Sequence, residues 1–286
     1  MLVWARGFVF AYKNNLELFT SAWWGVQFGP WVRREKQKRL YWGYFKEDSL
    51  PTKFRYYLFR LVSDVVVEPK LIDGISEKRR LYVFNNLIDN DDNDYFKELK
   101  PYRQHIKNEL YRRINPALLK QLEKYPKPTI GIHVRRGDFK HGSKVTPVSF
   151  FVNAINSVRS VSGEMLPVTV FTDATKYEIK EILALPSVQV ATPKQDILDI
   201  LLLSKSDICI LSINSTFSLW AAFLNDGIIL KHHEEWNPNI RPTAINEICY
   251  EGYFDPSKEM DETLKAQIRK CVELKKASTR DEQFQV

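Results

Sequence analysis

Cysteine, glycine and long apolar runs are all scarce in this sequence of 286 residues. The three cysteines lie far apart and form no C-x-x-C pair, which argues against a disulfide framework and a cysteine-based zinc site. No glycine-rich phosphate-binding fingerprint is present. The apolar start "MLVWARGFVFAY" is short, is interrupted by Arg6, and lacks the small-residue pattern of a signal-peptide cleavage site. These absences fit a cytoplasmic protein.

Apolar and basic residues are plentiful. Hydrophobic residues make up 44% of the chain and aromatic residues 13%, enough to build a sizeable core in one large or two ordinary domains. The formal net charge is +7 and the pI is about 9.1. Such a basic excess suits nucleic acid, an anionic membrane surface or a phosphate-bearing substrate, and it does not choose among them.

The second half of the chain alternates short apolar runs with helical patterns. This rhythm predicts βαβ units around a parallel sheet, an α/β fold whose strands are covered on both faces. The predicted strands are Thr129–Val134, Val168–Asp173, Ser187–Thr192, Ile208–Ser212 and, last, Gly227–Lys231. The predicted helices are Pro147–Ser160, Thr175–Leu185, Gln195–Ser206 and Asn214–Leu224.

The first half is rich in aromatic residues and less regular, with a helical stretch around Tyr95–Ile114. The proline-containing segment Leu122–Thr129 is a plausible hinge. We therefore predict an N-terminal domain over residues 1–125, a nucleotide-sugar-binding domain over 126–256, and a C-terminal helix and tail over 257–286. That helix places Leu264, Ile268, Cys271 and Val272 on one apolar face, and the polar tail after Lys276 is expected to fray.

The first candidate site is "HVRRGDF", where His133, Arg135, Arg136 and Asp138 follow a predicted strand. Ligands bind at the carboxyl ends of strands in open parallel sheets, and guanidinium groups match phosphate oxygens bidentately. The alternative is that one arginine faces solvent while the other pairs with Asp138. From the residues alone the two interpretations carry equal weight.

Two further candidates follow other predicted strands. In "INSTFS", residues Asn214, Ser215, Thr216 and Ser218 lie where a strand runs into a helix, and the free N–H groups of a helix start can bind an anion. A plain helix cap would give the same pattern, and we expect the N-S-T glycosylation sequon here to be inaccessible. Asp173, after the second strand, could accept hydrogen bonds from a ribose or a base edge, or could cap the next helix.

Three other clusters favour no specific site. The acidic run Ile88–Phe96 fails the EF-hand template, because Asp94 occupies the glycine position and Lys100 the final glutamate position. A solvated turn before a helix is the favoured interpretation of this run, and a D-x-D metal–diphosphate site is the alternative. In His232-His233-Glu234-Glu235, neighbouring residues of an extended segment point opposite ways, so joint metal ligation is awkward. The basic and aromatic segment Trp31–Phe45 suits a membrane surface, RNA or a sugar acceptor, and also a solvated loop.

Together, the three strand ends describe a pocket for a nucleotide diphosphate that uses no glycine-rich loop. The motifs "HVRRGDF", "VFTD" and "NSTFSLWAAFL", in this order, resemble those of the α-1,2-fucosyltransferases of glycosyltransferase family 11. The stretches "DILDILLLSKSDICI" and "YWGYF…DYFKELKPYR" are similar as well. The resemblance covers roughly residues 41 to 236.

The resemblance implies a GT-B-like architecture of two Rossmann-like domains that transfers fucose with inversion from GDP-fucose to a galactose-type hydroxyl of a glycan. It implies no metal or other cofactor, no nucleic-acid partner, and a cytoplasmic place that allows peripheral membrane contact. By motif match, Arg135 would hold the β-phosphate with Arg136 in support. His133 and Asp173 would lie near the guanine and ribose, and Asn214, Ser215, Thr216 and Ser218 near the diphosphate. Asp138 is the candidate general base.

The sequence also departs from the family pattern. Members usually open with a strand and a G-G-x-G-N loop, which are not found before "MLVWARGFVFAY". We therefore expect lower stability or activity than in a relative that has them. Ala174 and Leu219 replace residues usual in the motifs. The alternative function is a non-catalytic or truncated nucleotide-sugar-binding protein, or a transferase that uses another nucleotide sugar.

Overall fold

The computed structural model describes residues 1–20, 41, 43–46, 49–70, 79–85, 94–136, 145–192, 195–235, 237–242 and 247–283, with backbone alone from 278 onward. The chain divides into two compact units, Met1–Gln121 and Leu122–Val286. The boundary between them lies four residues before the predicted end of the first domain at residue 125. Each unit is described by itself.

The second unit is built on a six-stranded sheet in which all neighbours run parallel, in the order β5-β4-β3-β6-β7-β8. This confirms the predicted α/β class and the parallel sheet in the C-terminal half. The strands are β3 (Ile130–Val134), β4 (Val168–Thr172), β5 (Val188–Val190), β6 (Ile208–Ile210), β7 (Ile228–His232) and β8 (Tyr250–Phe254).

The sequence did not predict β8, and the prediction that β7 is the last strand is wrong. The strand reads Y-E-G-Y-F, and glycine and glutamate are both depleted in strands. A buried ion pair overrides that preference. Glu251 receives a hydrogen bond of 3.2 Å from Lys231 Nζ on β7, and the Lys231 side chain is fully buried.

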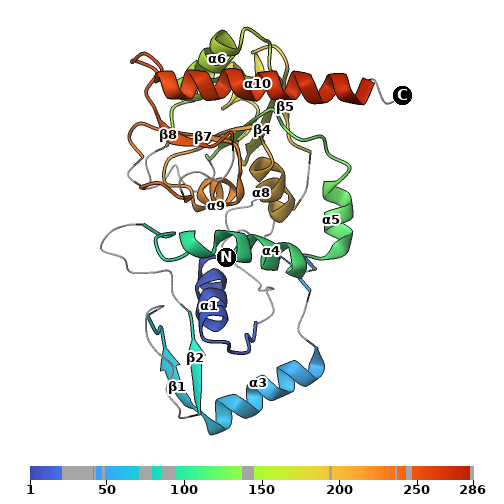
Figure 1. Ribbon diagram of the computed structural model, residues 1–286, viewed down its shortest axis with the longest axis vertical. Helices are drawn as coiled ribbons and strands as arrows, with labels where there is room; N and C mark the ends of the chain where they lie inside the picture. The colour runs from blue at the N-terminus through green and yellow to red at the C-terminus, as the bar shows by residue number, and fades with distance from the viewer. Residues whose placement is uncertain are drawn as a thin grey trace. The chain divides into compact units, whose positions relative to one another are not determined.

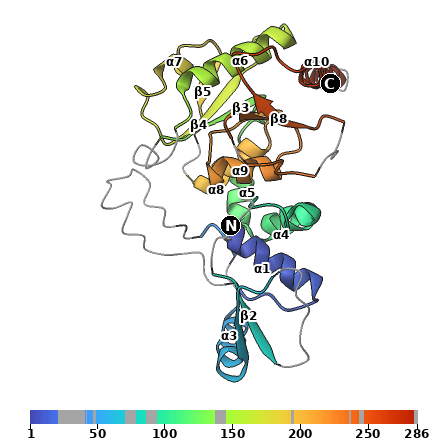
Figure 2. The same cartoon turned by 90° about the vertical axis from the view of Figure 1, so that its left-hand side faces the viewer.

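Helices cover both faces of this sheet (Figures 1 and 2). One face carries α6 (Val148–Ser162) and α10 (Glu262–Gln283), which pack on each other, and the other carries α8 (Asp196–Ser204) and α9 (Thr216–Leu224). The prediction of a frayed tail after Lys276 is wrong, because α10 continues to Gln283. Helix α7 (Lys180–Leu183) is shorter than predicted, because residues 176–179 form turns. Glu178 accepts a hydrogen bond from the Thr175 N–H at the start of these turns.

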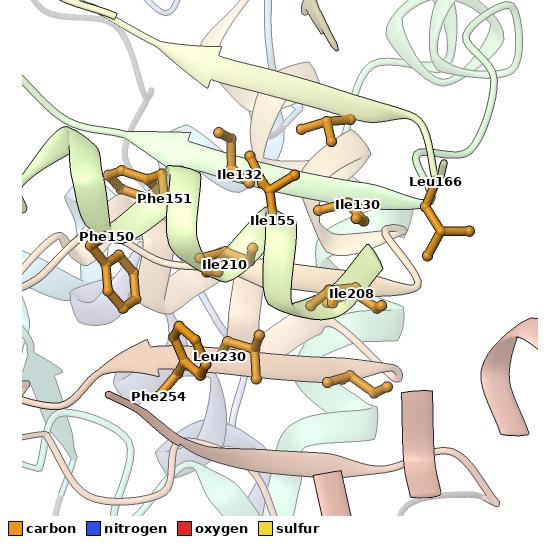
Figure 3. Close-up of a cluster of buried hydrophobic side chains, with 14 of the residues drawn as sticks. Ile130, Ile132, Phe150, Phe151, Ile155, Leu166, Ile208, Ile210, Leu230 and Phe254 are labelled. Carbon is orange, nitrogen blue, oxygen red and sulfur yellow. The ribbon is translucent and has the colours of Figure 1, made fainter. Parts of the chain in front are cut away.

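Side chains of alternate strand residues form the core under α6 and α10. Ile130 and Ile132 of β3, with Ile208 and Ile210 of β6, meet Ile155 of α6 (Figure 3). The predicted apolar face of α10 is buried in the same cluster, which confirms that prediction. The remaining members of β3, Gly131 and His133, therefore point to the opposite face, toward α8 and α9.

Gly131 permits the close approach of β3 and α8. A Cβ atom at this position would overlap Ser206 Oγ and would lie 2.9 Å from Leu203 Cδ1. Because Gly131 has no side chain, α8 can pack closer to the sheet at this point. Gly131 lies two residues before His133 on the same strand.

The first unit holds a small parallel sheet and several helices. Strands β1 (Asp64–Val67) and β2 (Arg80–Val83) pair in parallel. The helices are α1 (Leu2–Lys13), α3 (Leu50–Val62), the 3₁₀ helix η1 (Lys100–Tyr102), α4 (Arg103–Arg113) and α5 (Pro116–Leu122), which ends at the unit boundary. The helix predicted around Tyr95–Ile114 starts only after Pro101, which cannot donate to a preceding turn. Within the described residues, no helix is long and apolar enough to cross a membrane.

We predict that Gly131→Ala lowers the free energy of unfolding by about 1–3 kcal/mol, because overpacking forces α8 away from the sheet. Chemical denaturation would measure the loss. Adding Ser206→Gly should restore part of it by removing the overlapping side chain. As a comparison, Gly163→Ala has open space but a φ of 68°, so its cost should come from the backbone alone and should be insensitive to Ser206→Gly. Wild-type stability of Gly131→Ala would contradict this packing.

Candidate functional site

The candidate residues gather where the connectivity of the sheet reverses. The chain runs outward from β3 to β4 and β5, then crosses back to β6 on the other side of β3. The carboxyl ends of β3 and β6 therefore face a topological switch point, where the connections leave in opposite directions. Open α/β sheets bind their ligands at such a point.

His133, the fourth residue of β3, is tied to the first turn of α9. Its Nδ1 lies 2.6 Å from Ser218 Oγ, and its ring stacks on Phe217 with centroids 4.5 Å apart and planes 20° apart. Burial, with a smaller effect of the Arg135 charge, lowers the pKa of His133 from 6.5 to about 3. The imidazole is therefore neutral at physiological pH, and it links strand and helix as a hydrogen-bonding group.

Ser212, two residues after β6, closes the same junction from the other side. Its hydroxyl donates to the His133 carbonyl at 2.6 Å and accepts the Arg135 N–H at 3.0 Å. Its own N–H donates to Ser218 Oγ at 3.3 Å. The backbone that presents Arg135 is thus fixed by a side chain from the neighbouring strand.

Asp173 organises the arginine turn after β3. Its Oδ2 lies 2.5 Å from Arg135 Nη1, and its Oδ1 accepts the Arg136 N–H at 2.7 Å. Both carboxylate oxygens thus face the turn that carries the two arginines. Burial lowers the pKa of Arg136, which remains a cation, and Glu178 and Asp173 oppose that shift.

The approach to α9 supplies the predicted helix start. Ser215 is the N-cap, and its Oγ accepts the Ser218 N–H at 3.4 Å. Thr216 is exposed, whereas Ser215 and Ser218 are buried and hold protein groups. Of the four predicted residues, Thr216 and the half-buried Asn214 are the accessible ones. The N–H groups of the first turn and the positive end of the helix dipole face the switch point, an arrangement that favours an anion.

Sequence reasoning missed three residues that build this site. Ser212, Phe217 and Glu235 each contact a predicted residue, namely Arg135, His133 and Asn214 respectively. Phe217 lies inside the predicted motif, so its place beside the site was available from the sequence. The partners of Ser212 and Glu235 depend on which strands are neighbours, which the sequence does not state.

Asp138, the candidate base, lies outside the described residues, as do most of the acidic run Ile88–Phe96 and of the basic segment Trp31–Phe45. The described end of the acidic run is structural. Asp94 is buried, accepts the Phe96 N–H at 3.1 Å and pairs with Lys100 at 2.6 Å.

The His232-His233-Glu234 cluster differs from its prediction. The expectation that these side chains diverge is wrong, because β7 ends at His232 and the turn that follows brings their ligand atoms within 4.8 Å of one another. The two imidazole rings stack, with centroids 4.2 Å and planes 24° apart. Ring-nitrogen lone pairs lie in the ring plane, so two nearly parallel rings do not aim at a common ion without rotation of one ring.

Comparison with known proteins identifies the family. The sequence model of Glycosyl transferase family 11 matches residues 88–238, which is just over half of the chain. The chain belongs to glycosyl transferase family 11. The matched region includes the β3 arginine turn, Asp173 and the start of α9.

No curated protein matches the chain. Among solved structures, it is similar to "NodZ alpha-1,6-fucosyltransferase soaked with GDP-fucose", with 17% sequence identity and a TM-score of 0.39. The similar region covers 68% of this chain and 65% of the NodZ chain, so the match spans somewhat less than two thirds of that protein.

Stability should depend on pH through His133. Its pKa is about 3 in the folded protein and about 6.5 when unfolded, so between these values the unfolded state binds more protons. The contribution of neutral His133 to the free energy of unfolding is complete above pH 6.5. It is lost as the pH falls below that value, by up to about 1.4 kcal/mol per pH unit. Urea unfolding at pH 7, 6, 5 and 4 would measure this for the wild type and His133→Gln.

The difference between the two curves isolates His133 from all other titrating groups. We expect the advantage of the wild type over His133→Gln to shrink steadily between pH 6.5 and 4. A constant difference across that range would show that the imidazole is not buried as a neutral group.

Proposed function

We propose that this protein transfers fucose with inversion from GDP-fucose to a galactose-type hydroxyl of a glycan, forming an α-1,2 linkage. The observation that supports the proposal is that Ser212 bonds both to the Arg135 N–H and to Ser218 in the first turn of α9, in a family 11 chain. The choice of fucose and of the linkage rests on the resemblance of "HVRRGDF" and "NSTFSLWAAFL" to α-1,2-fucosyltransferase motifs.

The donor's diphosphate would bind between Arg135 and the start of α9. The guanidinium of Arg135 offers a planar fork for phosphate oxygens, and the first N–H groups of α9 offer donors with no helical partner. Asp173 already holds Arg135 in place, which favours a positioning role for this carboxylate over the ribose contact that the resemblance implies. Neutral His133 adds no charge of its own and keeps α9 at the correct depth.

Catalysis would come mainly from stabilising the leaving GDP. As the glycosidic bond breaks, negative charge grows on the β-phosphate, and fixed cations and helix N–H groups stabilise that charge more in the transition state than in the ground state. We propose Arg135 for this role, supported by Arg136. These two cations supply the charge that a divalent metal would otherwise provide, so we propose a reaction without one.

The acceptor hydroxyl must lose its proton as it attacks the sugar from the opposite face. A carboxylate within hydrogen-bond reach is suited to take it. We propose Asp138, three residues after Arg135, as this base, on its position in the motif alone.

GDP should raise the melting temperature, whereas UDP and ADP should not. At about 100 times its dissociation constant a ligand adds roughly 2.7 kcal/mol, which corresponds to about 5–10 °C for a domain of this size. Differential scanning fluorimetry measures the shift. An equal shift with all three nucleotides would contradict the proposed specificity for guanine. No shift with any of them would contradict GDP-fucose as the donor.

Turnover separates a transferase from a non-catalytic binder. We expect Arg135→Ala to lower kcat for GDP release by about 10²–10³-fold, because one preformed donor to the developing charge is lost. Arg269→Ala, which removes an exposed arginine of α10 on the other face of the sheet, is the matched control and should retain wild-type turnover. Nucleotide binding without turnover in the wild type would instead support the binder.

A further inference from the structure

Three consecutive residues on the approach to α9 are tied to other parts of the second unit by hydrogen bonds that involve a side chain. The Ser212 hydroxyl bonds to β3, the Ile213 N–H donates to Thr146 Oγ1 at 2.8 Å, and the Asn214 N–H donates to Glu235 Oε2 at 2.7 Å. Ser215 follows as the N-cap. Glu235 lies in the turn that follows β7, three residues after His232, and it is the carboxylate of this set.

Glu235 is almost fully buried, with 5% of its surface exposed. Its two oxygens are shared among three N–H donors. Oε2 accepts the Asn214 N–H, while Oε1 accepts the Asn237 N–H at 3.2 Å and the Asn237 side-chain Nδ2 at 2.7 Å. Its own N–H closes a turn to the His232 carbonyl at 2.9 Å, which fixes the backbone from which the carboxylate reaches across.

The backbone conformation of Asn214 needs stabilisation by a neighbouring group. Its φ is 53°, in the left-handed region that residues with a Cβ adopt at a cost, although asparagine tolerates it better than most. Its side-chain Oδ1 is buried and has no hydrogen-bond partner within the described part of the chain. The bond from Glu235 to the backbone N–H is therefore what ties this strained residue, and Ser215 after it, to the sheet.

A buried carboxylate beside an anion site is electrostatically unfavourable for anion binding, so its benefit must be geometric. Three converging donors require two acceptor oxygens in one plane. A carboxylate supplies both, whereas an amide of the same shape supplies one and turns an N–H₂ group toward the remaining donors.

We propose that Glu235 is a positioning residue for the donor site: by holding the Asn214 N–H it sets the place and direction of the α9 N-terminus that receives the diphosphate. This inference rests on the proposed function. The diphosphate contacts the helix start, and Glu235 acts on it only through Asn214 and Ser215.

The test compares Glu235→Gln with the wild type in GDP titrations, in donor kinetics and in hydrogen exchange of the 208–220 segment without nucleotide. Leaving buried donors unsatisfied should raise the dissociation constant of GDP and the KM for GDP-fucose by about tenfold. We expect kcat at saturating donor to change less, because Arg135 is still present. Exchange should accelerate at Asn214 and in the first turn of α9.

A second substitution keeps the inference testable if Glu235→Gln is merely less stable. In the double variant Glu235→Gln with Asn237→Asp, the amide Oε1 can accept the Asn214 N–H while its N–H₂ donates to the new carboxylate, so that of the three donors only the backbone N–H of residue 237 loses its acceptor. This exchange of partners should restore GDP affinity to within about threefold of the wild type. Glu234→Gln, at an adjacent side chain that is 42% exposed, is the matched control and should bind GDP normally.

Three outcomes would overturn the inference. Glu235→Gln could bind GDP as the wild type does with unchanged exchange, or it could lose thermal stability without losing affinity, which would make Glu235 structural only. The double variant could also fail to recover affinity while it regains stability. Absence of GDP binding in the wild type would instead overturn the proposed function, and the donor role of Glu235 with it.

Discussion

The hydrogen bond between His133 and Ser218 joins the two halves of the site. It connects the end of β3 to the first turn of α9 across a separation of 85 residues in sequence. Ser212 bonds to both sides of the same junction, so strand, helix and arginine turn share one network. Because His133 is buried and uncharged, this network is stable only while the imidazole stays unprotonated. Everything proposed about the diphosphate depends on the relative position that this junction sets.

Around that neutral junction, charged side chains are compensated by an opposite charge or by several N–H donors. Asp173 neutralises and orients Arg135, Glu235 collects three N–H donors, and Lys231 is buried against Glu251 on the last two strands. Removing one partner of such a buried set leaves the other uncompensated, which costs more than the pair itself contributes. A ligand phosphate at Arg135 would add a second anion to a guanidinium that already has one. We infer that Asp173 prepares the arginine, and that the phosphate adds bonds to donors that Asp173 does not use.

The sequence predicted much of this arrangement because it is encoded locally. Short apolar runs that alternate with helical patterns predicted β3 to β7, and capping residues predicted the start of α9, since both signals depend on neighbouring positions. Strand β8 escaped prediction because its glutamate and glycine disfavour a strand until Lys231 is placed beside it. The pairing of Asp173 with Arg135 and the hold of Glu235 on Asn214 depend on strand order, and no short-range pattern carries that information. The motif resemblance predicts that Ser218 and Asp173 contact the donor, whereas in the structure both bond to other protein groups, at the junction and at the arginine turn.

The most direct measurement is a crystal structure of the protein with GDP bound. The account predicts that the β-phosphate lies within hydrogen-bond distance of the Arg135 guanidinium and of backbone N–H groups at the start of α9, with the His133–Ser218 bond intact. A nucleotide bound away from the carboxyl ends of β3 and β6, or a diphosphate that contacts neither Arg135 nor α9, would contradict it.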